Sequence, residues 1–211
     1  MPAPPHPLTP PDWVAAAAWL GPVAVLVPVK AFAEAKVRLA PALRPAERAE
    51  LARTMASGVV TAARPLPVAV VCDDVDVARW ARSLAALVIW EPGRGLNGAV
   101  EAGVDQLGAA GVSQVIVAHA DLPHAAGLGV MGAMPGITLV PDRQRDGTNV
   151  IVVPSDAGFR FSYGPGSFAR HVLEADRLGM TATVVEDPRL AFDVDWPADL
   201  LTLAAHPAPP A

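Results

Sequence analysis

The sequence contains a single cysteine, Cys72, among its 211 residues. One cysteine excludes a disulfide within the chain and is typical of a reducing compartment, so we expect a cytoplasmic protein. Cys72 stands at the end of an apolar run, which indicates a small buried side chain rather than a reactive thiol.

Charged residues are also few, and basic residues are the smaller group. Lys, Arg, Asp and Glu make up 18% of the chain, with 16 basic and 21 acidic side chains and a formal net charge of -5. Proteins that bind nucleic acids usually carry a basic surface, so this balance argues against a nucleic-acid partner. A small anionic ligand would need a local concentration of Lys and Arg.

No apolar run is long enough to indicate a membrane span. Residues 14–29 come closest, but they are fewer than the roughly 20 apolar residues that a span needs, and Gly21-Pro22 interrupts them. The N-terminal residues also lack the Lys or Arg of a secretory signal, so we expect no membrane partner.

The chain has neither an internal repeat nor a linker that would mark a second domain. A hydrophobic content of 52% is sufficient for one core in a chain of this length. We expect a proline- and alanine-rich extension at residues 1–20, one domain at residues 21–204 and a tail at residues 205–211.

Hydrophobic patterning predicts an α/β fold. Residues 23–29 form a continuous apolar run, which is typical of a strand buried on both faces of a parallel sheet. Strands are predicted at residues 23–29, 67–72, 87–90, 114–118, 137–140, 149–153, 159–163, 181–185 and 191–194. Helices are predicted at residues 12–20, 45–63, 76–84, 97–109 and 167–177, and from Pro197 onward. Strands and helices alternate in the first half, whereas strands in the second half are shorter, so we predict a mixed, mostly parallel sheet flanked by helices.

Acidic residues stand where two of the predicted strands end. Asp121 follows the strand at 114–118, and Asp193 and Asp195 alternate in a predicted strand that would place both on one face. Mg²⁺ takes one or two carboxylates and leaves its other positions to water and phosphate. We therefore predict that Asp121, Asp193 and Asp195 bind Mg²⁺, with a helix cap as the alternative for Asp121 alone. His119 and His124 flank Asp121, but no third ligand at zinc spacing accompanies them.

Basic residues follow the first predicted strand. Lys30, Lys36 and Arg38 stand just after its carboxyl end, where open α/β sheets bind their ligands. They predict a triphosphate site that neutralises phosphate charge, and the alternative is a solvated basic loop.

A glycine-rich segment offers a competing interpretation. Gly93-Arg94-Gly95-Leu96-Asn97-Gly98 matches GxGxxG, and Asp121 follows near the spacing of a ribose-binding acid, as in a nicotinamide-dependent dehydrogenase. The segment, however, comes after two complete strand–helix units instead of opening the domain. We favour a glycine turn in which Asn97 contacts a nucleotide, and a purely structural turn remains open.

Two further loops combine glycine with hydroxyl side chains. They are Asp146-Gly147-Thr148-Asn149 and Tyr163-Gly164-Pro165-Gly166-Ser167, and the second opens a predicted helix. Free N–H groups at a helix start, together with the Ser167 and Thr148 hydroxyls, predict an anion site. His171, further along this helix, is expected to face the same pocket. The alternative is ordinary turn chemistry, with Ser167 capping its helix.

Taken in order, these motifs resemble the CofC/FbiD guanylyltransferase family. The likeness covers residues 23–203. It is carried by Val27-Pro28-Val29-Lys30, Ala35-Lys36-Val37-Arg38-Leu39, Cys72-Asp73-Asp74, Gly95-Leu96-Asn97, Ala120-Asp121-Leu122-Pro123, Asp146-Gly147-Thr148-Asn149, Phe161-Ser162-Tyr163-Gly164-Pro165-Gly166-Ser167-Phe168 and Asp193-Val194-Asp195. The segment that ends at Phe168 is the most diagnostic. The resemblance implies a single-domain GT-A-like nucleotidyltransferase fold.

The resemblance also implies roles for individual residues. Members of the family join the guanylyl group of GTP to phosphoenolpyruvate or to 2-phospho-L-lactate in the biosynthesis of coenzyme F(420). The implied phosphoacid contacts are Thr148, Gly164 and Ser167. From the motifs themselves we predict nucleotide contacts at Pro28, Lys30, Lys36 and Asn97 and catalytic roles for Lys30, Lys36, Asp121 and Asp195. Mg²⁺ is implied at Asp121 and the two terminal aspartates.

We therefore expect transfer of GMP from GTP to phosphoenolpyruvate with release of pyrophosphate. The alternatives are 2-phospho-L-lactate as acceptor, a nucleotidyltransferase for sugar phosphates or molybdopterin, the dehydrogenase, and a GTP-binding regulator without catalysis. A homodimer is left open.

Overall fold

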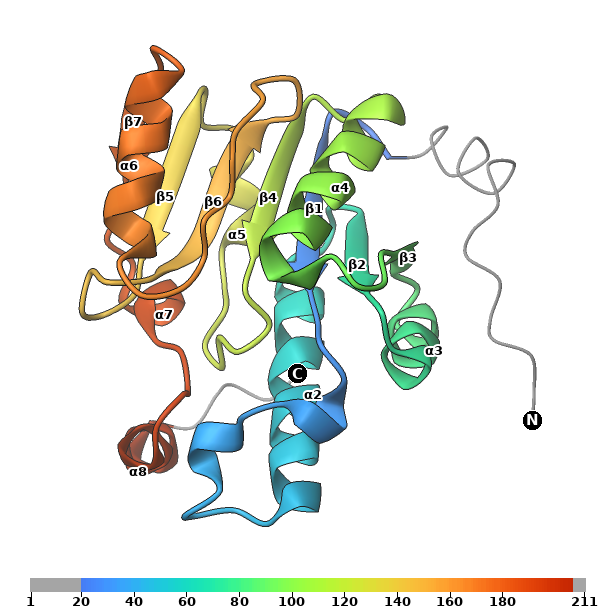
Figure 1. Cartoon of the computed structure of the whole chain (residues 1–211), viewed down its shortest axis with the longest axis vertical. Coiled ribbons are helices and arrows are strands. Elements are labelled where there is room, and N and C mark those ends of the chain that lie inside the picture. The colour runs from blue at the N-terminus through green and yellow to red at the C-terminus, as the bar shows by residue number, and fades with distance from the viewer. Residues whose placement is uncertain (1–19, 207–211) are drawn as a thin grey trace.

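A seven-stranded sheet runs through the centre of the computed structural model, which describes residues 20–206 (Figure 1). Its strands lie in the order β3-β2-β1-β4-β6-β5-β7. They are β1 (Val23–Pro28), β2 (Val68–Cys72), β3 (Leu87–Trp90), β4 (Gln114–Ala118), β5 (Ile137–Pro141), β6 (Thr148–Pro154) and β7 (Ala182–Val184). β6 runs antiparallel to its neighbours β4 and β5, and the other pairs are parallel. The mixed, mostly parallel sheet is thus confirmed.

Helices cover both faces of this sheet (Figure 1). One face packs against α2 (Pro45–Ala62), α3 (Val75–Ser83), α5 (Leu128–Met131), α7 (Pro188–Ala191) and the short turn η1 (Phe32–Glu34). The opposite face packs against α4 (Gly95–Ala109) and α6 (Ser167–Arg177). A small third cluster joins α8 (Pro197–Ala205) and the turn η2 (Val37–Leu39) to α2.

The central strand β1 shows why its sequence is apolar throughout. Val25 and Val27 point into the core under α2 and α3, whereas Ala24 and Leu26 point into the core under α4. All four side chains are buried, so neither face of the strand tolerates a polar residue. This two-sided burial holds the carboxyl end of β1, and the loop that follows it, in a defined place.

Residues 159–163 do not form the strand that the sequence predicts. Four consecutive N–H groups in this extended segment donate to side chains from α4 and α6 instead of to a neighbouring strand. The pairs are Arg160 N to Glu174 Oε1, Phe161 N to Glu101 Oε1, Ser162 N to His171 Nε2 and Tyr163 N to Asn97 Oδ1, at 2.7–3.1 Å. The acceptors alternate between the two helices because successive N–H groups of an extended chain point in opposite directions. The segment is therefore clamped between α4 and α6.

The strand predicted at residues 191–194 is also absent. Asp187 caps α7 by accepting a hydrogen bond of 2.9 Å from Arg189 N, and Pro188 occupies the first turn. Phe192 then leaves the helix with extended backbone, and Val194 N donates to Asp121 O at 3.3 Å. Asp193 and Asp195 thus stand on an extended segment beside Asp121, outside any strand.

The helix expected at residues 12–20 falls, apart from Leu20, outside the described residues. Within residues 20–206, no helix combines the length and apolar character needed to span a membrane.

Two glycine substitutions test the packing of α4 on β1. A Cβ at Gly103 would lie 2.7 Å from Cδ2 of Leu26, whereas a Cβ at Gly58 in α2 meets nothing within 4 Å. We expect Gly103→Ala to destabilise the protein by about 1–2 kcal/mol, because overpacking outweighs the gain in helix propensity. Gly58→Ala should stabilise it by about 0.5–1 kcal/mol. Urea unfolding of both variants measures these changes, and a gain in stability from Gly103→Ala would contradict the described packing.

Candidate active site

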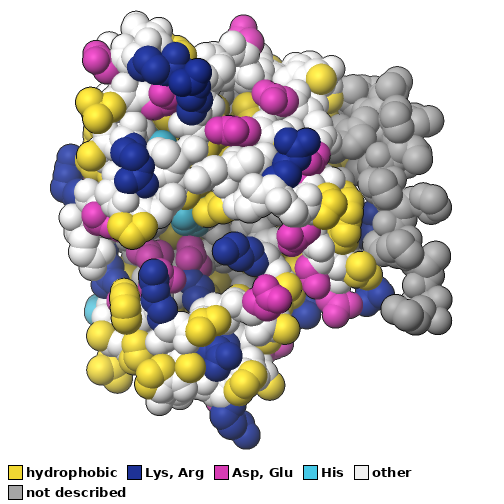
Figure 2. Space-filling model, in the orientation of Figure 1, with side chains coloured by type: hydrophobic (Ala, Val, Ile, Leu, Met, Phe, Trp, Pro, Cys, Tyr) yellow, Lys and Arg dark blue, Asp and Glu magenta, His cyan; other side chains and the backbone are white. Residues whose placement is uncertain are grey.

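A cavity of about 620 Å³ opens at the carboxyl ends of β1 and β4. The start of the antiparallel strand β6 and the loop before α6 complete its wall. Figure 2 shows acidic and basic side chains gathered around a hollow on this face. The sequence-predicted residues that line it are Pro28, Lys30, Lys36, Arg38, His119, Asp121, Thr148, Gly164, Ser167, Asp193 and Asp195. These residues, from five separate parts of the chain, meet in one place.

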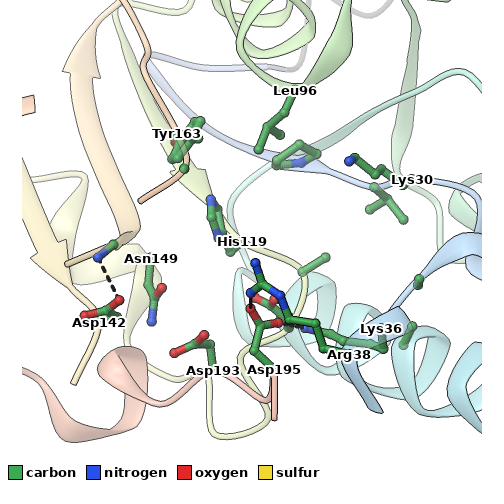
Figure 3. Close-up of a pocket in the computed structure, with 18 of the residues that line it drawn as sticks. Lys30, Lys36, Arg38, Leu96, His119, Asp142, Asn149, Tyr163, Asp193 and Asp195 are labelled. Atoms are coloured by element: carbon green, nitrogen blue, oxygen red, sulfur yellow. Dashed lines mark hydrogen bonds and ion pairs between the residues drawn. The ribbon is translucent and has the colours of Figure 1, made fainter. Parts of the chain in front are cut away.

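Lys36 lies at the centre of the charged residues. Its Nζ donates to Asp121 Oδ2 at 2.6 Å and to Asp195 Oδ1 at 2.8 Å. The Lys36 side chain is only 9% exposed, whereas Arg38, which contacts the outer oxygen of Asp195 at 2.9 Å, is 58% exposed. Figure 3 shows Lys36, Arg38 and Asp195 together, with Asp193 beside them. The buried ammonium thus holds two carboxylates that come from distant parts of the chain.

The pKa shifts of Lys36 and Asp121 follow from burial and from the charges around them. Burial alone would lower the pKa of Lys36, but attraction to Asp121 and Asp195 outweighs it and raises the pKa above its ordinary value. Burial alone would raise the pKa of Asp121, but the lysine lowers it below its ordinary value. Lys36 and Asp121 are therefore both charged at neutral pH.

Backbone strain at Lys36 accompanies this arrangement. The residue adopts left-handed backbone angles, φ 54° and ψ 39°, immediately before η2. Such angles cost a residue with a Cβ on the order of 1 kcal/mol and are common at functional sites. In this conformation the Lys36 side chain is largely buried and contacts both carboxylates.

Asp193 adds a third carboxylate to the cluster. Burial, together with repulsion by Asp121 and Asp195, raises the pKa of Asp193 to about 6. This cluster carries more negative charge than Lys36 alone can balance.

One carboxylate oxygen of the cluster has no partner in the described part of the chain. Asp121 Oδ1 is buried and has no hydrogen-bond partner among the described residues, so one carboxylate oxygen is left for a further ligand. Within residues 20–206, however, no group of three or more His, Cys, Asp or Glu side chains is placed so that it could hold a metal ion. His124 stacks on Phe192 with ring centroids 5.3 Å apart, away from the cavity lining.

The cavity lining also offers uncharged hydrogen-bond donors, which we call the donor end: Thr148, Gly164 and Ser167. The three residues line the cavity together. Gly164 has φ 117°, a value that a side chain would strain. Among the described residues, the Gly164 N–H group donates no backbone hydrogen bond, and Ser167 lines the cavity. Both are available to an anion.

The start of α6 is less open than the sequence indicated. Gly166 N donates to Asp146 Oδ1 at 3.0 Å, and Phe168 N donates to Asp146 O at 3.0 Å. Asp146 therefore occupies the helix N-terminus, and an anion at the donor end meets Gly164 and hydroxyl groups instead. Sequence reasoning missed this role, although an aspartate before Gly147 is a typical loop-ordering residue.

Asn97 and Tyr163 are joined by a hydrogen bond. The Asn97 Oδ1 atom accepts from Tyr163 N at 2.7 Å, so this oxygen serves the clamp around residues 160–163. Tyr163, which the sequence did not single out as a cavity residue, lies over His119 with ring centroids 4.8 Å apart.

The glycine-rich segment follows the edge strand β3 and not the central strand β1, so it is not a dinucleotide-binding fingerprint.

Removing the charge of Lys36 should invert how stability depends on pH. In the wild type, the lowered pKa of Asp121 contributes stability at neutral pH that is lost as acid protonates the carboxylate. In Lys36→Met, Asp121 keeps its burial and loses its cation, so its pKa rises and stability falls as pH increases. We expect a loss of about 2–4 kcal/mol at pH 8 and a smaller loss at pH 4.5, measured by urea unfolding in metal-free buffer.

Lys30→Met is the matched control. Lys30 is exposed and forms no ion pair with the residues described, so its substitution should change stability by less than about 0.5 kcal/mol. Equal losses for the two variants, or a loss for Lys36→Met that does not grow with pH, would contradict the described ion pairs.

Comparison with solved structures supports the fold. A nucleotidyl transferase from Methanothermobacter superposes with a TM-score of 0.66 at 16% identity, covering 88% of this chain and 97% of that chain. Glucosyl-3-phosphoglycerate synthase from Mycobacterium tuberculosis superposes with a TM-score of 0.53 at 14% identity, covering 96% of this chain and 86% of that chain. At these identities the likeness shows the fold alone, and it confirms the expected GT-A-like nucleotidyltransferase architecture.

Comparison of sequences shows the family. The family model described as guanylyl transferase CofC like matches residues 23–208. A phosphoenolpyruvate guanylyltransferase from Rubrobacter xylanophilus is 39% identical, covering 87% of this chain and 94% of that protein. A 2-phospho-L-lactate guanylyltransferase from Methanothermobacter thermautotrophicus is 33% identical, covering 86% of this chain and 83% of that protein. The chain therefore belongs to the CofC family of guanylyltransferases.

Proposed function

We propose that this protein transfers GMP from GTP to phosphoenolpyruvate, giving enolpyruvyl-diphospho-guanosine and pyrophosphate for coenzyme F(420) biosynthesis. The observation that carries the proposal is that the lining of one cavity combines the charged residues around Lys36 with the neutral donors of Thr148, Gly164 and Ser167. Such a cavity suits two anionic substrates that must meet. Three relatives named for phosphoenolpyruvate, at 39%, 36% and 35% identity, are more similar to this chain than the 2-phospho-L-lactate enzyme at 33%, which favours phosphoenolpyruvate as acceptor.

The reaction needs no general base. A phosphate oxygen of the acceptor attacks the α-phosphorus of GTP in line, the bond from that phosphorus to the bridging oxygen breaks, and pyrophosphate leaves with the electron pair. A phosphate monoester has a second pKa near 6, so the acceptor is already largely dianionic at neutral pH. Catalysis then consists of positioning the two substrates and neutralising their charge.

Each end of the cavity receives one substrate in this proposal. Lys30 and Lys36 contact the triphosphate and offset the charge that builds on pyrophosphate, and Pro28 ends β1 beside them. Thr148, Gly164 and Ser167 bind the phosphoacid through hydroxyl and N–H donors. Asn97 contacts the nucleotide only through its Nδ2 atom, because its Oδ1 atom holds Tyr163.

Asp121, Asp193 and Asp195 would hold Mg²⁺. When bound, the ion supplies positive charge that lowers the repulsion between the two anionic substrates. The unpartnered Oδ1 atom of Asp121 supports this assignment because it leaves one oxygen for a further ligand, and the raised pKa of Asp193 supports it because repulsion from Asp121 and Asp195 is not balanced there.

The choice of acceptor is tested directly. Purified protein is incubated with GTP, Mg²⁺ and, in turn, phosphoenolpyruvate, 2-phospho-L-lactate and a sugar 1-phosphate. Pyrophosphate release and product mass are measured. We expect turnover to be fastest with phosphoenolpyruvate. Faster turnover with 2-phospho-L-lactate would identify that compound as the acceptor in place of phosphoenolpyruvate. Turnover with the sugar phosphate alone would reject the proposal.

Asp195→Asn tests the acidic residues. It keeps the side-chain shape but removes the charge that faces Lys36, so we expect kcat to fall by about 10²–10³-fold. The control is Asp76→Asn, whose carboxylate pairs with Arg79 on an exposed turn of α3. Melting curves check that both variants fold. Wild-type turnover by Asp195→Asn at saturating Mg²⁺ would overturn the assignment of Asp195.

A further inference from the structure

His171 is a buried histidine that the proposed chemistry does not use. It lies on α6 with 0% of its surface exposed and has two polar neighbours. Its Nε2 atom is 3.0 Å from the backbone nitrogen of Ser162, and its Nδ1 atom is 3.0 Å from Thr148 Oγ1. The histidine thus joins the clamped segment 160–163 to the first residue of β6.

Counting protons fixes the direction of both hydrogen bonds. A backbone N–H group can only donate, so Nε2 must present its lone pair to Ser162. A neutral imidazole carries one proton, which then resides on Nδ1 and is donated to Thr148 Oγ1. The Thr148 hydroxyl therefore accepts from the histidine, and its own proton must point elsewhere.

The surroundings of His171 keep the ring neutral. Its centroid lies 5.7 Å from that of Phe159, 6.5 Å from Phe161 and 5.2 Å from Tyr163. Burial, together with the nearby charge of Arg170, lowers the pKa of His171 to about 4. The single-proton argument therefore holds across the neutral range.

We propose that His171 is a positioning residue that fixes the Thr148 hydroxyl as a hydrogen-bond donor toward the phosphoacid. A freely rotating hydroxyl would present a lone pair to the anion part of the time and repel it. With Thr148 fixed, the hydroxyl can join the Gly164 N–H group and the Ser167 hydroxyl in donating to one anion. This inference rests on the proposed function for the identity of that anion.

The direction of the Thr148 proton is important because the three residues of the donor end are themselves uncharged. Arg170 lies nearby, but its guanidinium donates to the carbonyl oxygens of Ser162 and Pro165, both at 2.6 Å. The charge of Arg170 still favours an anion nearby, but the hydrogen bonds from Thr148, Gly164 and Ser167 come from neutral groups, and each of these groups binds the anion only if its proton points toward it.

Two substitutions separate the two hydrogen bonds of His171. The amide nitrogen of an asparagine reaches the position of Nδ1 and can still donate to Thr148, so His171→Asn keeps the contact that we propose to matter. The amide oxygen of a glutamine reaches the position of Nε2, so His171→Gln keeps the bond to Ser162 and loses the donor to Thr148.

Steady-state kinetics with GTP and phosphoenolpyruvate then test the inference. We expect His171→Gln and Thr148→Val each to raise KM for phosphoenolpyruvate about 10-fold, the loss expected for one hydrogen bond to an anion, while KM for GTP stays within 2-fold. The double variant should be no worse than Thr148→Val, since His171 acts through that hydroxyl. His171→Asn should recover most of the loss. The inference would be overturned if the increases in KM for phosphoenolpyruvate from the two single variants multiplied in the double variant. It would also be overturned if His171→Gln left this KM unchanged.

A second measurement needs no turnover. Long-range ¹H–¹⁵N correlation spectra of ¹⁵N-histidine-labelled protein report the tautomer of each ring, and the His171→Asn spectrum assigns the signal. We expect His171 to be neutral with its proton on Nδ1 at pH 7. A proton on Nε2, or a doubly protonated ring, would overturn the inference. Absence of product from wild-type protein would instead reject the proposed function and leave this tautomer unchanged.

Discussion

The ammonium group of Lys36 is the interaction on which the site depends. It contacts Asp121 and Asp195, which lie 85 and 159 positions away in the sequence, and so joins the loop after β1, the end of β4 and the segment before α8. Without a cation there, two carboxylates would face each other in a poorly solvated space. The left-handed backbone of Lys36 is the local cost of placing the nitrogen between them.

The rest of the cavity follows from the same balance of charge. Three carboxylates around one buried lysine leave room for further positive charge, whereas the donor end contains neutral groups ordered by other side chains. Asp146 occupies the start of α6, and His171 orients Thr148. The two ends therefore differ in kind, which suits a reaction between a triphosphate and a smaller phosphoacid.

The first half of the fold could be predicted from sequence because strands such as β1 are apolar on both faces and are followed by helices with clear starts. The two incorrect strands, 159–163 and 191–194, have the expected extended pattern but no neighbouring strand. For the first segment, the groups that accept its N–H hydrogen bonds stand on helices, and Asn97 lies 66 positions away from Tyr163 in the sequence. An alternating pattern tells which side chains share a face, but not which group accepts an N–H. For the same reason, the sequence predicted that Lys36 binds phosphate but could not show that its ammonium group contacts both Asp121 and Asp195.

The central claim is that the protein aligns two anions and forms no bond to the nucleotide itself. The stereochemical course at the α-phosphorus tests this claim most directly, with one diastereomer of the α-thio analogue of GTP as donor and phosphoenolpyruvate as acceptor. A single in-line attack by the acceptor predicts inversion of configuration at phosphorus. Retention would require two displacements through a guanylylated side chain and would contradict the account.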